Sequence, residues 1–192
     1  MSDQIELSIL GHLTGILDSL NIAYAVSGSM ASSVYGRVRF TQDADLTVEP
    51  FPAKAQQFLE LVRKDYYIDA DAMYYALDHR TSFNIIHLQT AFKIDLFVRG
   101  ETEFQKQLIP RRCMVRLSQT DPTEFAVVSP EDIVLLKLTW YVQGSRTSDR
   151  QLDDIRGILA TQRDRLDFTY LKKWASILEV ADVLEDVLKE LT

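Results

Sequence analysis

The chain has 192 residues, 46% of them hydrophobic, and a net charge of −7, as in an ordinary globular protein. This charge argues against a broad nucleic-acid-binding surface, although a small basic groove is compatible with it. The single cysteine, Cys113, excludes an intrachain disulfide and suits a reducing cytosol. The acidic start does not resemble a signal peptide, and no apolar run approaches the roughly 20 residues of a membrane span. We therefore expect a cytoplasmic protein with no membrane contact.

Short apolar runs and helical periodicity alternate along the chain and predict an α/β fold. The predicted strands lie at residues 22–28, 43–50, 82–88, 92–98, 113–118 and 124–128. The predicted helices lie at residues 3–20, 29–36, 52–64, from Pro130 onward, and near 149–160, 168–178 and 180–190. This order predicts a small mixed sheet with an N-terminal helix in residues 1–128. Residues 129–192 form a C-terminal helical bundle that we expect to pack on that core.

The stretch from Val26 to Pro50 carries the chemistry that stands out. Strand side chains alternate between faces, so Asp43, Asp45 and Thr47 share one face while the apolar residues between them face the core. We expect the two carboxylates to lie side by side at an exposed sheet edge. Their mutual repulsion is unfavourable unless a cation is bound, and Mg²⁺ prefers such oxygen ligands.

The segment 92–98 repeats this alternation and places Asp95 on its polar face. An aspartate in so apolar a strand is costly to bury without a partner. If the two strands are neighbours, Asp95 joins Asp43 and Asp45. Three carboxylates could then hold two metal ions, as in phosphoryl or nucleotidyl transfer.

Gly28 and Ser29 precede the carboxylates, at a predicted turn from strand to helix. Glycine lets backbone amides approach a phosphate, and a helix N-terminus favours the negative charge. A second Asp-x-Asp triplet, Asp69 and Asp71, has no Gly-Ser before it, and Asp71 fits an N-cap for a helix over 72–77. We therefore interpret only the first triplet as a functional site.

The motifs "GSMASSVYGRVRFTQDADLTV" and "FKIDLFV" resemble the signature of the DNA polymerase beta-type nucleotidyltransferase superfamily. Arg39 and Thr41 ahead of the aspartates, and the segment 129–159, narrow the resemblance to AbiEii-like toxin nucleotidyltransferases and their small relatives. It implies a nucleotidyltransferase fold and transfer of a nucleotide from a triphosphate such as ATP, with two Mg²⁺ ions. It also implies an RNA, protein or small-molecule acceptor and an antitoxin-type partner.

The resemblance also implies roles for individual residues. Asp43, Asp45 and Asp95 would hold the metal ions, and Asp95 would accept a proton from the attacking hydroxyl. The nucleotide-binding residues would be Gly28, Ser29, Arg39, Thr41 and Lys137. Lys137 and Asp154 would complete the catalytic set, whereas Gln151 stands where the family has an acidic residue.

Two simpler interpretations stay open at this point. Lys137 could extend from an apolar helix face to solvent, and Asp154 could be an exposed helical charge. The chain could also be a catalytically silent nucleotide-binding or protein-interaction module that retains the fold. Intact Asp43, Asp45 and Asp95 favour the enzyme, whereas Gln151 favours the silent module.

Overall fold

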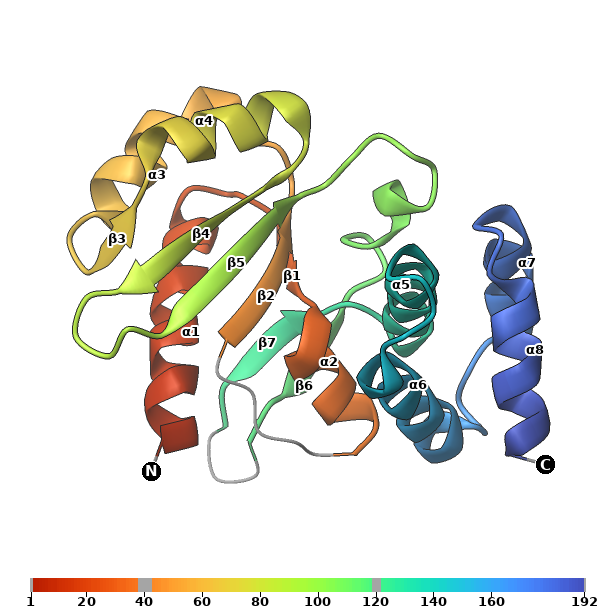
Figure 1. Ribbon diagram of the computed structural model, residues 1–192. Coiled ribbons are helices and arrows are strands. Elements are labelled where there is room, and N and C mark those ends of the chain that lie inside the picture. Colours follow the sequence, from red (N-terminus) through yellow and green to blue (C-terminus); the bar gives the residue numbers. More distant parts are fainter. Residues whose placement is uncertain (1, 38–42, 119–121, 192) are drawn as a thin grey trace. The chain divides into compact units, whose positions relative to one another are not determined.

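The computed structural model describes residues 2–37, 43–118 and 122–191 (Figure 1). Contacts divide the chain into two compact units. The first comprises Met1–Ser27 and Thr41–Val127, and the second comprises Gly28–Phe40 and Val128–Thr192. Helix α2 (Gly28–Tyr35) thus belongs to the second unit, although it follows strand β1 of the first directly in sequence.

The first unit is built on a seven-stranded mixed sheet in the order β3-β4-β5-β2-β1-β7-β6. Its strands are β1 (Tyr24–Val26), β2 (Asp43–Val48), β3 (Tyr66–Ile68), β4 (Ser82–His87), β5 (Lys93–Val98), β6 (Cys113–Arg116) and β7 (Glu124–Val127). The pairs β2–β5 and β1–β7 are parallel and the others antiparallel. All six predicted strands and the mixed α/β class are confirmed, and β3 is an additional strand.

Helices α1 (Ser2–Ser19), α3 (Ala55–Val62) and α4 (Ala70–His79) cover one face of this sheet (Figure 1). Two short 3-10 helices, η1 (Pro52–Lys54) and η2 (Gln105–Gln107), lie in the connections. Alternate apolar residues of β2 and β5 point to the helix-covered face and are buried; they are Ala44, Leu46, Val48, Ile94, Leu96 and Val98. The polar residues of both strands therefore share the opposite face.

The start of α4 differs from the prediction. Asp69, not Asp71, is the N-cap: its carboxylate accepts a hydrogen bond from the Ala72 N–H at 3.1 Å. The predicted cap at Asp71 is wrong because β3 ends at Ile68 and the helix begins immediately afterwards, at Ala70. Asp71 lies in the first turn, where its charge favours the helix dipole.

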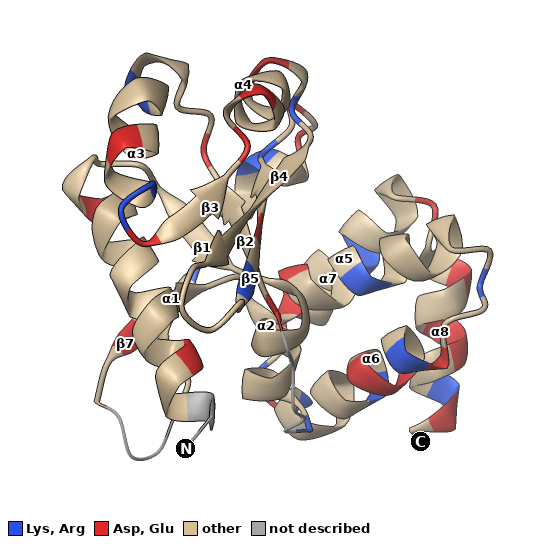
Figure 2. Ribbon diagram, turned by 60° about the vertical axis from the view of Figure 1, so that its left-hand side comes forward, with Lys and Arg blue, Asp and Glu red and all other residues tan. Residues whose placement is uncertain are grey.

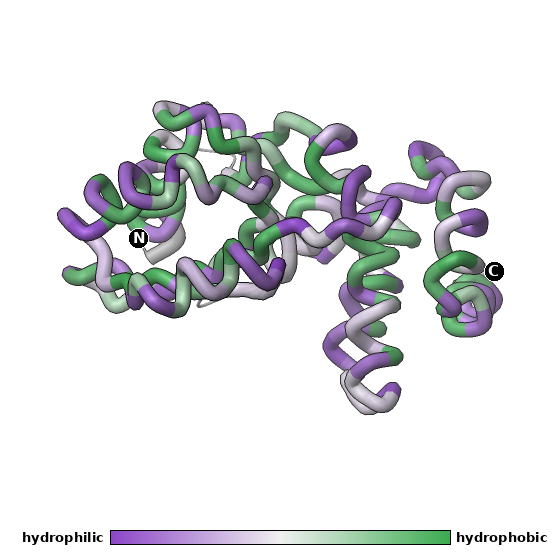
Figure 3. The backbone as a smooth tube through the Cα atoms, turned by 90° about the horizontal axis from the view of Figure 1, so that it is seen from above, coloured by the Kyte–Doolittle hydropathy of each residue, from purple (hydrophilic) through white to green (hydrophobic). Residues whose placement is uncertain are grey.

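The second unit is helical and consists of α2, α5 (Pro130–Gln143), α6 (Asp149–Gln162), α7 (Phe168–Ile177) and α8 (Ala181–Glu190). The predicted N-cap Ser129 is confirmed, since its hydroxyl accepts from the Asp132 N–H at 3.1 Å. Acidic and basic residues line α6 and α8 (Figure 2). Among the described residues, no helix has the length and apolar character to span a bilayer, and hydrophilic residues interrupt the helices throughout (Figure 3).

Helix α2 packs closely against α6 within this unit. A Cβ at Gly36, just after α2, would lie 2.9 Å from the Ile158 backbone nitrogen and 3.0 Å from the Gly157 carbonyl carbon. The side-chain amide of Gln162 donates to the Tyr35 carbonyl at 3.0 Å. The backbones meet without an intervening side chain, so this contact depends on glycine.

Candidate functional site

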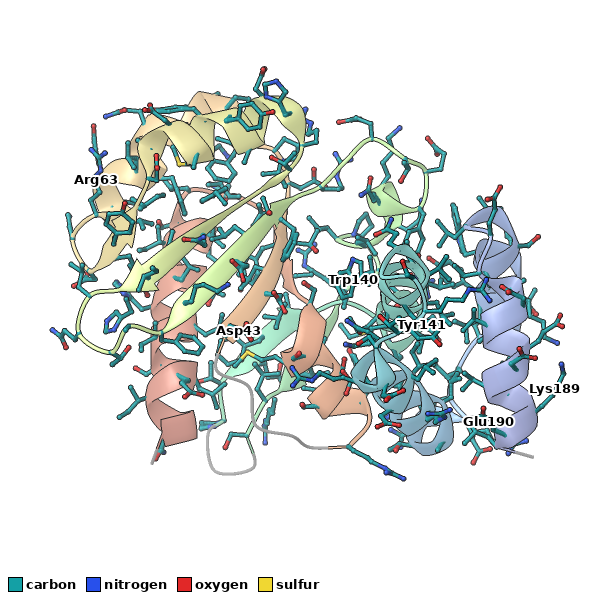
Figure 4. The ribbon with its side chains drawn as sticks, viewed as in Figure 1. Asp43, Arg63, Trp140, Tyr141, Lys189 and Glu190 are labelled. Carbon is teal, nitrogen blue, oxygen red and sulfur yellow. The ribbon has the colours of Figure 1, made fainter. Side chains whose placement is uncertain are left out.

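Three predicted carboxylates come together on the polar face of two adjacent parallel strands. In the β2–β5 register, Asp45 lies opposite Asp95, and Asp43 lies opposite Lys93. Asp43 begins β2 (Figure 4). The predicted neighbourhood of the two strands is confirmed.

The predicted position at an exposed sheet edge is wrong, because β2 is an interior strand between β5 and β1. Both β2 carboxylates are half-buried, as is Asp95. Thr47 shares their face but is buried. The carboxylates therefore lie on one face of the sheet, in the N-terminal halves of β2 and β5, and not on an edge strand.

Sequence reasoning missed the cation in this group. Lys93 Nζ lies 2.7 Å from the Asp95 Oδ2, and both side chains come from the same face of β5. The hydrogen bond to Asp95 raises the Lys93 pKa, and the charges of Asp95, Asp43 and Asp45 add to the increase, while partial burial opposes it. Lys93 and Asp95 are at positions i and i+2 of a strand and so share one face, which is the signal that could have identified this pair.

The chemistry of these residues suits a hard divalent cation, since carboxylate oxygens are the ligands that Mg²⁺ prefers. However, no group of three or more His, Cys, Asp or Glu side chains within residues 2–37, 43–118 and 122–191 is arranged to hold a metal ion. Asp95 is bound to Lys93 instead. The predicted two-ion centre thus stays a prediction, and its donors would have to rearrange to form it.

The row of polar groups continues into the neighbouring strands. On β4, Asn84 lies opposite Asp95 and is exposed. On the other side, the Ser27 N–H donates to the Asp45 carbonyl at 2.8 Å. Three adjacent strands, β4, β5 and β2, therefore place a polar residue at this level, and Ser27, which follows β1, is bonded to Asp45 through the backbone.

Gly28 follows Ser27 directly and begins α2. Its φ of 58° lies in the left-handed region, where glycine is favoured over residues with a side chain. Ser29 is the second residue of the helix and is half-buried. The strand-to-helix turn expected for a phosphate-binding backbone is present; Arg39 and Thr41, however, lie outside the described residues.

The second unit contains a buried ion pair between α5 and α6. Lys137 Nζ lies 2.7 Å from the Asp154 Oδ2, and the two side chains are only 2% and 8% exposed. The interpretations of Lys137 as reaching solvent and of Asp154 as an exposed charge are therefore wrong. Lys137 also donates to the Gln151 side-chain oxygen at 3.0 Å, and its ammonium lies 5.9 Å from the centre of the Trp140 ring on α5 (Figure 4).

Gln151 stands where the resemblance expects an acidic residue. Its side-chain oxygen accepts a hydrogen bond from the Lys137 ammonium, beside the ion pair that the lysine makes with Asp154. The exposed charges nearby pair elsewhere: Arg156 binds Asp153 at 3.1 Å and Glu190 at 2.7 Å. Compared with an acidic residue at this position, Gln151 carries one negative charge less.

No family model matches the sequence, and no curated protein matches it. Solved structures share its fold over nearly its whole length. The antibiotic-resistance factor ANT(2'')-Ia matches with a TM-score of 0.58 and 11% identity, over 98% of this chain and 96% of that one. A second structure of that factor, in complex with adenylyl-2''-tobramycin, matches with a TM-score of 0.54 and 12% identity, over 91% and 97% of the chains.

Two other solved structures are similar at comparable levels. An antigenic nucleotidyltransferase-like protein from Paracoccidioides brasiliensis has a TM-score of 0.56 and 19% identity, over 98% of this chain and 93% of that one. JHP933 from Helicobacter pylori has a TM-score of 0.51 and 14% identity, over 100% and 94%. The specific resemblance to AbiEii-like toxins stays a prediction. The chain shares the fold of these nucleotidyltransferase structures.

Proposed function

We propose that the protein transfers a nucleoside monophosphate from a nucleoside triphosphate to an acceptor in a Mg²⁺-dependent reaction. The observation that carries this proposal is the register of β2 and β5, which sets Asp45 opposite Asp95 with Asp43 on the same face. Side chains on rigid neighbouring strands hold their geometry better than side chains on loops. The fold that the chain shares with nucleotidyltransferase structures supports the same activity.

The three carboxylates would hold the Mg²⁺ ions, with Asp43 and Asp45 on the triphosphate side and Asp95 toward the acceptor. Mg²⁺ supplies charge neutralisation at the reacting phosphate and lowers the pKa of a bound hydroxyl when it is present. Asp95 would accept the proton of the acceptor hydroxyl as general base. The phosphate–acceptor bond forms as the bond to pyrophosphate breaks.

The resemblance gives further roles to residues of the second unit, and we retain them as predictions. Gly28 and Ser29 would donate hydrogen bonds to phosphate oxygens, since a helix N-terminus favours an anion. Lys137 would offset charge on the leaving pyrophosphate. Asp154, whose carboxylate lies 2.7 Å from the Lys137 ammonium, would hold that ammonium in place.

The acceptor remains open among an RNA 3′ end, a protein side chain and a small molecule. A structure of ANT(2'')-Ia holds adenylyl-2''-tobramycin, which is an adenylylated small molecule. The toxin–antitoxin role and a protein partner follow from the sequence resemblance alone. The alternative, a silent module that binds nucleotide without transferring it, is favoured by the missing acidic residue at Gln151 and by the Lys93–Asp95 contact.

The test is incubation of the purified chain with each α-³²P-labelled nucleoside triphosphate, Mg²⁺ and separate pools of RNA, protein and small-molecule acceptors. We expect label transfer, and we expect Asp45→Asn to reduce it by at least about a hundredfold. Asp71→Asn is the matched control, because that residue belongs to the other Asp-x-Asp triplet and lies exposed on α4. Nucleotide binding without transfer would establish the silent module, and transfer that survives Asp45→Asn would refute the proposed site.

A further inference from the structure

We propose that Lys93 is a built-in counter-ion of the carboxylate group, which binds Asp95 in the metal-free protein and is displaced when a divalent cation enters. This inference rests on the proposed function, since it concerns how the same carboxylates acquire their metal. Its basis is the position of the lysine inside the acidic cluster. The carboxylate of Asp95 is already paired with the ammonium of Lys93.

The β2–β5 register arranges four charges as two facing pairs. Asp43 faces Lys93 across the strands, and Asp45 faces Asp95 one step further along. Lys93 and Asp95 are also neighbours on the same face of β5, and their ammonium and carboxylate are 2.7 Å apart. Three negative charges therefore surround one positive charge, and the ammonium reduces a repulsion that would otherwise act between adjacent strands.

The Lys93–Asp95 ion pair is exposed enough to solvent to dissociate. The Lys93 side chain is 42% exposed, and the Asp95 side chain is 21% exposed. A lysine carries its ammonium on a flexible four-carbon stem, so Lys93 can turn toward solvent without leaving an unsolvated charge. Lys137 is the contrasting case, because its side chain is only 2% exposed and has no comparable route to water.

The chemistry of the exchange follows from charge. A divalent cation competes for the Asp95 oxygens and brings twice the charge of the ammonium to the same carboxylates. The lysine remains tethered nearby, so it rebinds Asp95 when the metal leaves. We thus expect Lys93 to weaken metal binding while it keeps the metal-free carboxylates folded together.

The experiment measures Mn²⁺ affinity by electron paramagnetic resonance for the full chain without nucleotide. We expect Lys93→Met to bind Mn²⁺ about 3- to 10-fold more tightly than the unmodified protein, because one partly exposed competing charge is removed. Lys93→Arg keeps the charge and should retain the original affinity. The matched control is Lys106→Met: Lys106 has the same 42% side-chain exposure and lies 2.9 Å from Glu103, outside the carboxylate group.

A second variant pair connects the effect to Asp95. Adding Asp95→Asn to Lys93→Met should abolish the gain in affinity, since the released ligand is then absent. Unchanged or weaker Mn²⁺ binding by Lys93→Met, beside intact label transfer by the unmodified protein, would overturn this inference alone. Absence of both Mn²⁺ binding and label transfer in every variant would overturn it together with the proposed function.

Discussion

The buried ion pair between α5 and α6 provides a quantitative test of the second unit. Replacing Lys137 by Met, or Asp154 by Leu, leaves one charge in an environment where the side chains are only 2% and 8% exposed. At an effective dielectric constant of about 20, two unit charges about 4 Å apart attract each other by about 4 kcal/mol. Removing one partner of a buried pair costs about 3–5 kcal/mol, because it leaves the other charge buried and uncompensated. We expect each single variant to lose that much unfolding free energy.

The double variant Lys137→Met/Asp154→Leu removes both charges and fills the space with apolar groups. It should recover most of the lost stability, because no buried charge remains unpaired. Urea unfolding followed by circular dichroism on all four proteins closes a double-mutant cycle and yields the coupling energy. Lys189→Met on α8 is the control (Lys189 is labelled in Figure 4): it breaks the pair with Asp186, in which both side chains are 72% exposed, and should cause no measurable change.

Single variants that each cost less than about 1 kcal/mol would refute this reasoning, because that is the range of a solvated surface pair. A double variant as unstable as the singles would show that the charges themselves are not the source of the loss. The first result would contradict the burial of the pair, and the second would contradict the role assigned to its charges.

Two further predictions concern packing and pH. Gly36→Ala should destabilise the second unit by about 1–3 kcal/mol in urea unfolding, since the new Cβ would lie 2.9 Å from the Ile158 backbone nitrogen. The control is Gly15→Ala inside α1, where the new Cβ has no atom within 4 Å. This variant should stabilise the protein by about 0.5–1 kcal/mol. Burial raises the pKa of Tyr66 and Tyr24, so above about pH 10 the unfolded chain loses these protons before the folded chain does, and stability should fall as pH rises. Urea midpoints from pH 9 to 11 should show a smaller decline for Tyr66→Phe, and an equal decline would contradict this cause.

Local patterns predicted much of the fold. The alternation in residues 43–48 and 92–98 correctly separated the polar from the apolar face, because period two is a property of any strand. The Ser129 cap and the helix after it were likewise readable from local sequence. Strand β3 was missed because its three residues include an exposed Tyr67 and are too few to show a period.

What the sequence could not supply was pairing between distant segments. The placement of Asp95 opposite Asp45 was a conditional expectation until the strands were seen to be neighbours. The burial of Asp154 depends on α5 and α6 packing together, and an isolated helical aspartate usually faces solvent. The Lys93–Asp95 pair, by contrast, depends only on local sequence, because residues at positions i and i+2 of a strand share a face.

The allocation of α2 to the second unit has a consequence for how the chain folds. During synthesis, α2 emerges roughly a hundred residues before α5 and α6, the helices that it contacts in that unit. The helical unit therefore cannot close until the intervening sheet segments have been made. A fragment that begins at Val128 would lack α2 and expose the faces of α5 and α6 that it covers. Neither unit is a contiguous segment, so dividing the chain at a single peptide bond cannot yield both intact.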